Sequence, residues 1–124
     1  MKRVLVDTSI WIKHFRGKDR TLENLLKNDR VLVHPYIMGE LLLGNLKKNS
    51  EVYRLLESLE LCKIVSLQEV LELISIRGLS GTGIGWVDAT ILSSAVISKC
   101  LLYTDDNNLK QVLKSKVKEA VFSH

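Results

Sequence analysis

Short runs rich in valine, isoleucine and leucine alternate along this chain with longer segments whose apolar residues recur at helical spacing. Strand-like runs lie at residues 2–6, 30–33, 63–65 and 101–104, and a final edge strand is expected near residues 120–122. Helical segments lie at residues 10–15, 22–26, 35–46, 52–59, 70–76, 86–98 and 109–113. Because repeated alternation of strand and helix builds right-handed parallel crossovers, the pattern predicts an α/β fold with a mainly parallel sheet covered on both faces.

The size and composition of the chain suit one compact domain spanning residues 1–124. With 46% hydrophobic and 26% charged residues, the chain can bury enough apolar surface to offset the entropy of folding, which excludes wholesale disorder. No apolar run reaches the roughly 18–20 residues that span a bilayer, and Asp7 interrupts any signal peptide, so we expect a cytoplasmic protein without a membrane anchor. The net charge of +4 is compatible with a polyanionic partner but does not require one.

The cysteines and histidines have no spacing typical of a metal site. Cys62 and Cys100 are far apart in the sequence and belong to no CxxC pair, so we predict two buried free thiols instead of a zinc site or a disulfide. His14, His34 and His124 form no HxxxH pair, which favours surface or local hydrogen-bonding roles over metal ligation.

Carboxylates directly follow two of the predicted strands. Asp7 comes after the run at 2–6, and the pair Asp105 and Asp106 comes after the run at 101–104. In an open α/β sheet, ligands bind beyond the carboxyl ends of the strands. We therefore expect these acids at one rim of the sheet.

Two further carboxylates lie on helices that can face the same rim. Asp88 opens the helical segment at 86–98, and Glu40 lies inside the apolar segment at 35–46. Helix capping remains an alternative explanation for each aspartate. Glu40 is different, because a helix that is apolar nearly all round is predicted to be buried, and a buried carboxylate needs a compensating partner. We favour a bound cation as that partner.

A cluster of carboxylates predicts a hard divalent cation, because close carboxylates repel one another until a cation neutralises them. Mg²⁺ and Mn²⁺ favour oxygen ligands of this kind. Either ion can lower the pKa of a bound water and orient a phosphodiester for in-line attack. Such chemistry requires no serine or histidine nucleophile.

Four spaced motifs that carry these acids resemble those of a PIN-domain nuclease. They are Val4-Leu5-Val6-Asp7-Thr8-Ser9-Ile10-Trp11-Ile12, Gly39-Glu40-Leu41, Gly85-Trp86-Val87-Asp88-Ala89 and Leu102-Tyr103-Thr104-Asp105-Asp106. The motifs cover nearly the whole chain. Its length and the run Gly-Ile-Gly-Trp-Val-Asp are most similar to the VapC-type toxins of bacterial toxin-antitoxin pairs.

The resemblance implies a three-layer α/β/α sandwich and an endoribonuclease that depends on Mg²⁺ or Mn²⁺. It assigns the catalytic and metal-binding acids to Asp7, Glu40, Asp88 and Asp106. The family pattern of Thr, any residue and Asp selects Asp106 over Asp105, with Thr104 as a supporting residue.

The resemblance also implies the partners of this chain. RNA is the expected substrate, cleaved by metal-activated water in a single-stranded segment or loop. A small antitoxin is expected to cover the acidic groove, and the toxin is expected to be a homodimer. Many relatives carry a further acid and an aromatic where this chain has Asn108 and Leu109, so whether Asn108 or Asp105 assists a second metal ion stays open.

Basic and aromatic side chains near these motifs admit two interpretations. A cluster that begins shortly after Asp7 could guide a phosphate backbone or form a solvated helix end, and it contains Lys13, His14, Arg16, Lys18 and Arg20. An ordinary exposed helical face explains the spacing of Lys110, Lys114 and Lys118. A place in the core is favoured over base stacking for Trp11, Phe15 and Tyr36.

Two other functions stay open on the sequence alone. A phosphoacceptor signalling domain also places acids and Mg²⁺ at a parallel-sheet rim, but no Asp occurs between Asp29 and Asp88 to serve as the acceptor after a central strand. A non-catalytic RNA- or protein-binding module of the same fold could keep the four acids as a metal site. A stable acyl phosphate would favour the first alternative, and metal-dependent RNA scission would favour the nuclease.

Overall fold

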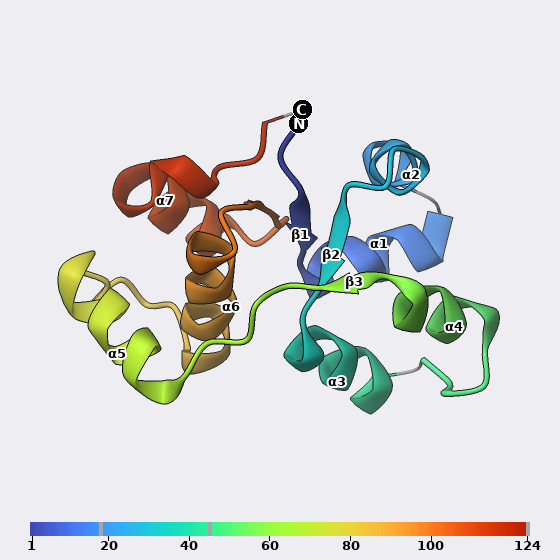
Figure 1. Cartoon of the computed structure of the whole chain (residues 1–124), viewed down its shortest axis with the longest axis horizontal. Helices are drawn as coiled ribbons and strands as arrows, with labels where there is room; N and C mark the ends of the chain where they lie inside the picture. Colours follow the sequence, from blue (N-terminus) through green and yellow to red (C-terminus); the bar gives the residue numbers. More distant parts are fainter. Residues whose placement is uncertain (18, 45, 124) are drawn as a thin grey trace.

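A four-stranded parallel sheet forms the centre of the computed structural model, which describes residues 1–17, 19–44 and 46–123 (Figure 1). Its strands are β1 (Val4–Val6), β2 (Val31–Val33), β3 (Glu60–Leu61) and β4 (Leu101–Tyr103), in the spatial order β3-β2-β1-β4. In the register of the sheet, Val4 of β1 pairs with Val31 on one side and with Leu101 on the other. The predicted α/β fold with a parallel sheet is confirmed.

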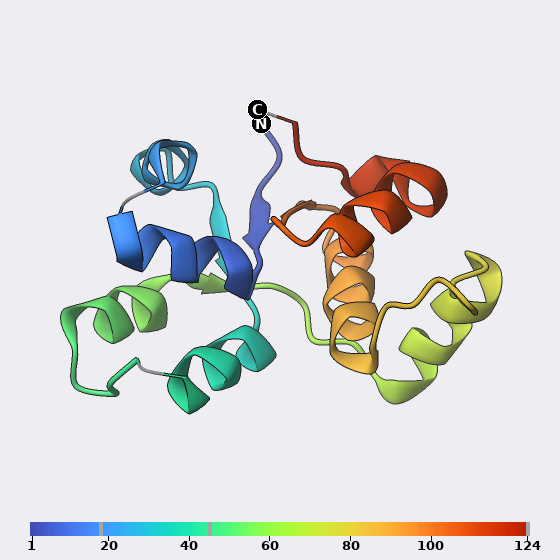
Figure 2. The same cartoon turned by 180° about the vertical axis from the view of Figure 1, so that it is seen from behind.

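Helices cover the sheet on both sides, as predicted for a three-layer sandwich. In the described ranges they are α1 (Thr8–Gly17), α2 (Arg20–Lys27), α3 (Pro35–Leu43), α4 (Glu51–Ser58), α5 (Leu67–Ile76), α6 (Trp86–Ile97), α7 (Asn107–Lys116) and the short 3₁₀ helix η1 (Lys118–Ala120). Figures 1 and 2 show α1 to α4 on one side of the strands and α5 to α7 on the other. None of these helices in the described ranges is long and apolar enough to cross a membrane.

Burial of the inner strands explains why they are uninterrupted apolar runs in the sequence. Every residue of β1 and β2 is buried, which is typical of parallel strands covered on both faces. α6 is buried from Ala89 to Ala95, so it packs as a central helix beside the sheet. Because the strands are parallel, their carboxyl ends meet at one rim, where the segments after β1 and β4 place their side chains.

The helix predicted at residues 35–46 is shorter and more exposed than expected. It ends at Leu43, because the backbone leaves helical geometry at Gly44. Ile37 and Leu41 are its buried residues, whereas Leu43 is 89% exposed. The prediction of a largely buried helix is wrong, because α3 meets the core along one stripe with the spacing of a single helical turn.

Two predicted strands differ from the structure. The strand predicted at 63–65 lies at Glu60–Leu61, and Val65 instead packs into a small cluster with residues of α5 and α6. The edge strand predicted near 120–122 is replaced by η1 and a single parallel bridge between Val121 and Leu102.

Both cysteine thiols are free and buried, as predicted. Burial is the largest cause that raises the pKa of Cys62 and of Cys100 to about 11. Both thiols are therefore protonated at neutral pH.

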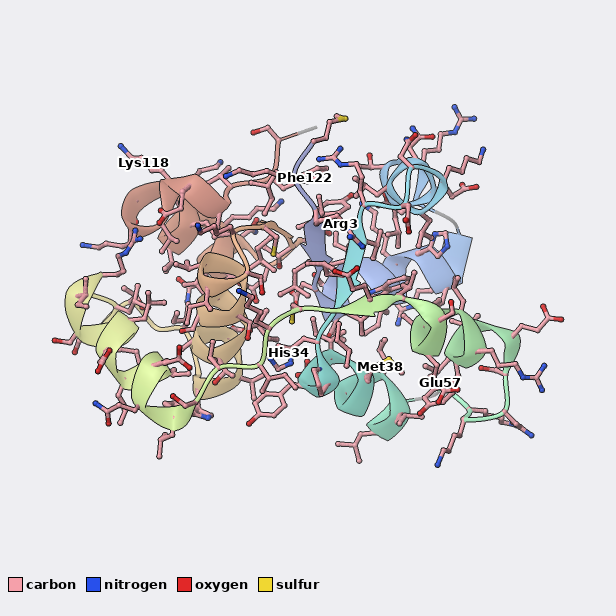
Figure 3. All side chains as sticks on the ribbon, viewed as in Figure 1. Arg3, His34, Met38, Glu57, Lys118 and Phe122 are labelled. Atoms are coloured by element: carbon pink, nitrogen blue, oxygen red, sulfur yellow. The ribbon has the colours of Figure 1, made fainter. Side chains whose placement is uncertain are left out.

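Two histidines have the local hydrogen-bonding roles that were predicted. His14 Nδ1 accepts the Asp19 backbone N–H at 3.0 Å, and His34 Nδ1 accepts the Tyr36 backbone N–H at 2.9 Å. Figure 3 shows His34 at the junction of β2 and α3, where burial lowers the pKa of its imidazole. His124 lies outside the described residues.

Candidate active site

Asp7 follows β1 directly, and two hydroxyl groups hold its carboxylate. Thr104 Oγ1 donates to Asp7 Oδ2 at 2.7 Å, and Ser9 Oγ donates to the same oxygen at 3.2 Å. The Asp7 backbone N–H donates to the carbonyl of Tyr103 at 2.9 Å, and the residue is only 7% exposed. No described side chain donates to the other oxygen, Oδ1, which stays available to a ligand.

The Thr104 hydroxyl joins Asp7 to Asp106. It accepts the Asp106 backbone N–H at 3.1 Å while it donates to Asp7. Asp106 Oδ1 accepts the Leu109 backbone N–H at 2.9 Å, so Asp106 caps α7 as the capping interpretation predicts. Capping and a place beside Asp7 are therefore compatible.

Ser9 makes a second connection across the same rim, and the sequence analysis gave it no role there. Its oxygen accepts the Asp105 backbone N–H at 3.0 Å while it donates to Asp7. The Asp105 carboxylate itself is exposed and pairs with Lys110 at 3.4 Å. In the sequence, only the Asp-Thr-Ser motif pointed to a role for Ser9. The contact of Ser9 with Asp105 could not be predicted, because it forms only when β1 and β4 pair.

Glu40 reaches the rim from α3 and is exposed. Thr8 Oγ1 donates to Glu40 Oε1 at 2.7 Å. The argument that a buried Glu40 requires a cation is wrong, because solvent and this hydroxyl satisfy the carboxylate.

Asp88 lies in the first turn of α6 and is half-buried. Its pKa is raised from 3.8 to about 6, chiefly by burial and then by the charges of Asp7, Asp106 and Glu40. Because charges act on a pKa only from nearby, the structure brings the four predicted acids into one electrostatic neighbourhood.

The four carboxylates are close without forming a closed set of ligands. In the ranges 1–17, 19–44 and 46–123, no three Asp, Glu, His or Cys side chains lie close enough together to hold a metal ion. No described Lys or Arg forms an ion pair with any of the four acids, so their mutual repulsion is uncompensated. A set of carboxylate oxygens with uncompensated charge fits Mg²⁺ or Mn²⁺ in its chemistry.

A tight loop before α6 packs against the start of α7. Gly83 has a φ of +88°, and a Cβ at this position would lie 3.1 Å from Asn108 Nδ2. The positive φ favours glycine here, and the absence of a Cβ also makes room for the Asn108 side chain. It joins the segment that leads to Asp88 to the helix that Asp106 caps.

A groove of about 490 Å³ opens beside Glu40, between α1 and the segment that follows α3. Ile12 and Phe15 give it an apolar wall, and Arg16 and Lys47 add positive charge. The core assignment is confirmed for the fully buried Trp11 and is wrong for Phe15 and Tyr36, which are 38% and 45% exposed.

The basic cluster after Asp7 divides into two parts. Lys13 Nζ lies 3.9 Å from the Asp19 carboxylate, and His14 bonds the Asp19 backbone, so both contact the residue that caps α2. Arg16 lines the groove, Arg20 is exposed, and Lys18 lies outside the described residues.

The predicted lysine face is divided between two helices. Lys110 and Lys114 lie on α7, whereas Lys118 belongs to η1 and extends from the edge of the molecule in Figure 3.

Residues 4–114, which include all four acids, match the PIN domain family. This chain belongs to the PIN-domain family. It is 43% identical over 108 residues to Ribonuclease VapC32 of Mycobacterium tuberculosis, in both strain CDC 1551 / Oshkosh and strain ATCC 25618 / H37Rv. The alignment covers 86% of this PIN domain and 87% of each relative.

A solved structure confirms the fold of this PIN domain. The crystal structure of PAE2754 from Pyrobaculum aerophilum superimposes with a TM-score of 0.61 at 20% sequence identity. The superposition covers 94% of this chain and 85% of that chain.

Proposed function

We propose that this PIN domain is a metal-dependent endoribonuclease and the toxin of a toxin-antitoxin pair. The proposal depends on one observation: acids from distant segments meet at one rim, where the Thr104 hydroxyl joins Asp7 to Asp106 and the Thr8 hydroxyl joins Glu40 to the start of α1. Burial and then the charges of these three acids raise the pKa of Asp88. The name of the VapC32 ribonucleases, at 43% identity, supports the same reaction. Membership of the PIN-domain family favours a nuclease over a phosphoacceptor domain.

We assign the binding of Mg²⁺ or Mn²⁺ to Asp7, Glu40, Asp88 and Asp106. When bound, such an ion supplies a more acidic water and stabilises charge on the leaving oxygen of a phosphodiester. The hydroxyls of Thr104 and Ser9 orient Asp7 through Oδ2 and leave Oδ1 as its ligand atom. With a pKa of about 6, Asp88 is ionised in most molecules at pH 7 and can serve as a ligand.

Single-stranded or looped RNA is the proposed substrate. A flexible strand can bring one phosphodiester to the rim while its flanking phosphates contact cationic side chains. Arg16 and Lys47 lie in the groove beside Glu40 and supply such contacts. Because this substrate is cellular RNA, we expect the protein to act in the cytoplasm. We also propose that residues 1–124 form one domain.

Two protein partners belong to the proposal. The apolar wall formed by Ile12 and Phe15 suits a segment of a small antitoxin that covers the acids. A homodimer is also proposed, because Leu67 and Leu71 on one face of α5 are exposed large hydrophobic residues.

Substitution of Asp7 by Asn tests the reaction. Asp7→Asn keeps the side-chain shape and removes the charge, so metal-dependent cleavage should fall by about 100-fold or more while the far-UV circular dichroism is unchanged. The assay incubates purified protein with cellular RNA in Mg²⁺ or EDTA and maps new ends by sequencing. Asp29→Asn is the matched control, because Asp29 is exposed in a turn whose positive φ of 55° Asn also adopts.

The outcomes of this assay separate the candidate functions. Full cleavage by Asp7→Asn in Mg²⁺ would contradict the role of Asp7. Metal binding by the wild type without any new RNA ends would favour the non-catalytic module. A stable acyl phosphate formed from a small phosphodonor would favour the phosphoacceptor domain.

A further inference from the structure

Thr8 holds the Glu40 carboxylate. Its Oγ1 donates to Glu40 Oε1 at 2.7 Å, and no other described side chain forms a hydrogen bond or ion pair with this carboxylate. Within the part of the chain that the structure describes, the Thr8 hydroxyl is therefore the one side-chain group that holds the Glu40 carboxylate in place.

An exposed glutamate needs such a restraint if it is to act as a ligand. Glu40 lies on the solvent-facing part of α3, and a free glutamate side chain samples many rotamers. Fixing that side chain when a ligand binds costs entropy, which a hydrogen bond already present in the free protein reduces.

Thr8 is well placed to restrain Glu40. It is the first residue of α1, is half-buried and directly follows Asp7 in the chain. The backbone that sets the direction of Asp7 therefore also sets the Thr8 hydroxyl. Through this bond the carboxylate on α3 is coupled to the end of β1, although the two residues are 32 positions apart.

We propose that Thr8 is a positioning residue that pre-organises Glu40 for a divalent cation, an inference that rests on the proposed function. The bond selects the Glu40 rotamers that keep the carboxylate beside the start of α1. Oε1 accepts from the hydroxyl, and no donor among the described residues bonds to Oε2. In this proposal Thr8 acts through its hydrogen bond to Glu40.

Three variants test the role of Thr8. Thr8→Val keeps the branched shape and removes the hydroxyl, and Thr8→Ser restores a hydroxyl. Thr82→Val is the matched control, because Thr82 is also half-buried and its hydroxyl also donates at 2.7 Å, to the carbonyl of Leu79. Isothermal titration with Mn²⁺ measures metal affinity, and the Mg²⁺-induced rise in Tm gives a second readout that requires no RNA.

Thr8→Val should weaken Mn²⁺ binding by about three- to tenfold, the effect expected from losing one hydrogen bond to an exposed charged group. At Mn²⁺ concentrations that do not saturate the site, the kcat of Thr8→Val should be lower than that of the wild type, and it should recover at high Mn²⁺. The KM for RNA should change by less than about twofold. Thr8→Ser and Thr82→Val should bind Mn²⁺ within about twofold of the wild type. Without metal, both Val variants should show similar Tm values, because each loses one hydroxyl bond.

Equal Mn²⁺ affinity in the wild type and Thr8→Val would overturn the inference, and so would failure of Thr8→Ser to restore binding. If Thr8→Val does not fold, Thr8→Ala is judged by the same criteria. A wild type that neither binds Mn²⁺ nor cleaves RNA would refute the proposed function itself. A wild type that does both, beside an unimpaired Thr8→Val, would refute only the role of Thr8.

Discussion

At the scale of single residues, burial and then the charges of Asp7, Asp106 and Glu40 raise the pKa of the Asp88 carboxyl. Its pKa is about 6 in the folded protein, against an ordinary value of 3.8. Between these two values the native state binds more protons than the unfolded chain does. The metal-free protein should therefore lose stability as the pH rises from about 4 to 6.

Asp88→Asn should stabilise the metal-free protein at pH 7, because it removes the charge that burial and the other acids oppose. A shift of this size corresponds to about 3 kcal/mol, and solvent screening at a half-buried position reduces the expected gain to about 1–2 kcal/mol. Urea unfolding in EDTA at pH 4 and pH 7 measures the effect, and most of the gain should disappear at pH 4.

A control and a metal titration complete this comparison. Glu57→Gln changes an exposed acid on α4, which Figure 3 shows apart from the sheet, and should leave stability at pH 7 nearly unchanged. Mg²⁺ should raise the Tm of the wild type more than that of Asp88→Asn. An equal gain from Asp88→Asn at both pH values would contradict an electrostatic origin.

At the scale of elements, Asp106 caps α7 and is also a proposed ligand. Asp106→Asn keeps a capping side chain without the charge, whereas Asp106→Ala removes both. The free energy of unfolding of the Asn variant should lie within about 0.5 kcal/mol of the wild-type value, and that of the Ala variant should be about 1 kcal/mol lower. Both should lose RNA cleavage. Unfolding in urea measures the capping role, and the cleavage assay measures the role as a ligand. An Asn variant that still cleaves RNA would show that Asp106 acts only as a helix cap.

Local signals predicted where several helices begin but not where α3 ends. Pro35 occupies the first turn of α3, and Asp106 caps α7, both for reasons of backbone chemistry that the sequence contains. Apolar residues continue at helical spacing beyond Leu43, so periodicity alone could not reveal the change of backbone at Gly44.

The position of β3 also could not be predicted locally. Residues 63–65 have the higher β propensity, yet Glu60–Leu61 pair with β2. The partner strand decides which residues of an edge segment pair, because propensity measures the fit to a surface that the rest of the fold provides.

At the scale of the whole molecule, the rim itself could be predicted and its hydroxyl contacts could not. Parallel strands place their carboxyl ends together, so the acids after β1 and β4 follow from topology. Thr8 and Ser9 contact residues 32 and 96 positions away, which only the packed structure reveals. The exposure of Glu40 likewise depends on which stripe of α3 meets the core.

The two thiols give a test of how the whole structure opens. Cys62 follows β3 and Cys100 precedes β4, and both are buried in the same core cluster. With pKa values of about 11, roughly one thiol in a thousand is ionised at pH 8, so Ellman's reagent should label neither within minutes. Both should react at once in 8 M urea. Fast labelling of one thiol in buffer would instead indicate local opening of the structure around that thiol.

The strand order has a consequence for synthesis on the ribosome. Among the strands of the described residues, β1 is made first and β4 last, yet the two lie side by side. Asp7 is therefore made well before Thr104 and the Asp106 segment, with which it is connected in the folded protein. A nascent chain that has not yet made β4 lacks the assembled rim, so we expect the proposed nuclease to be inactive toward the transcript that encodes it until β4 has been made.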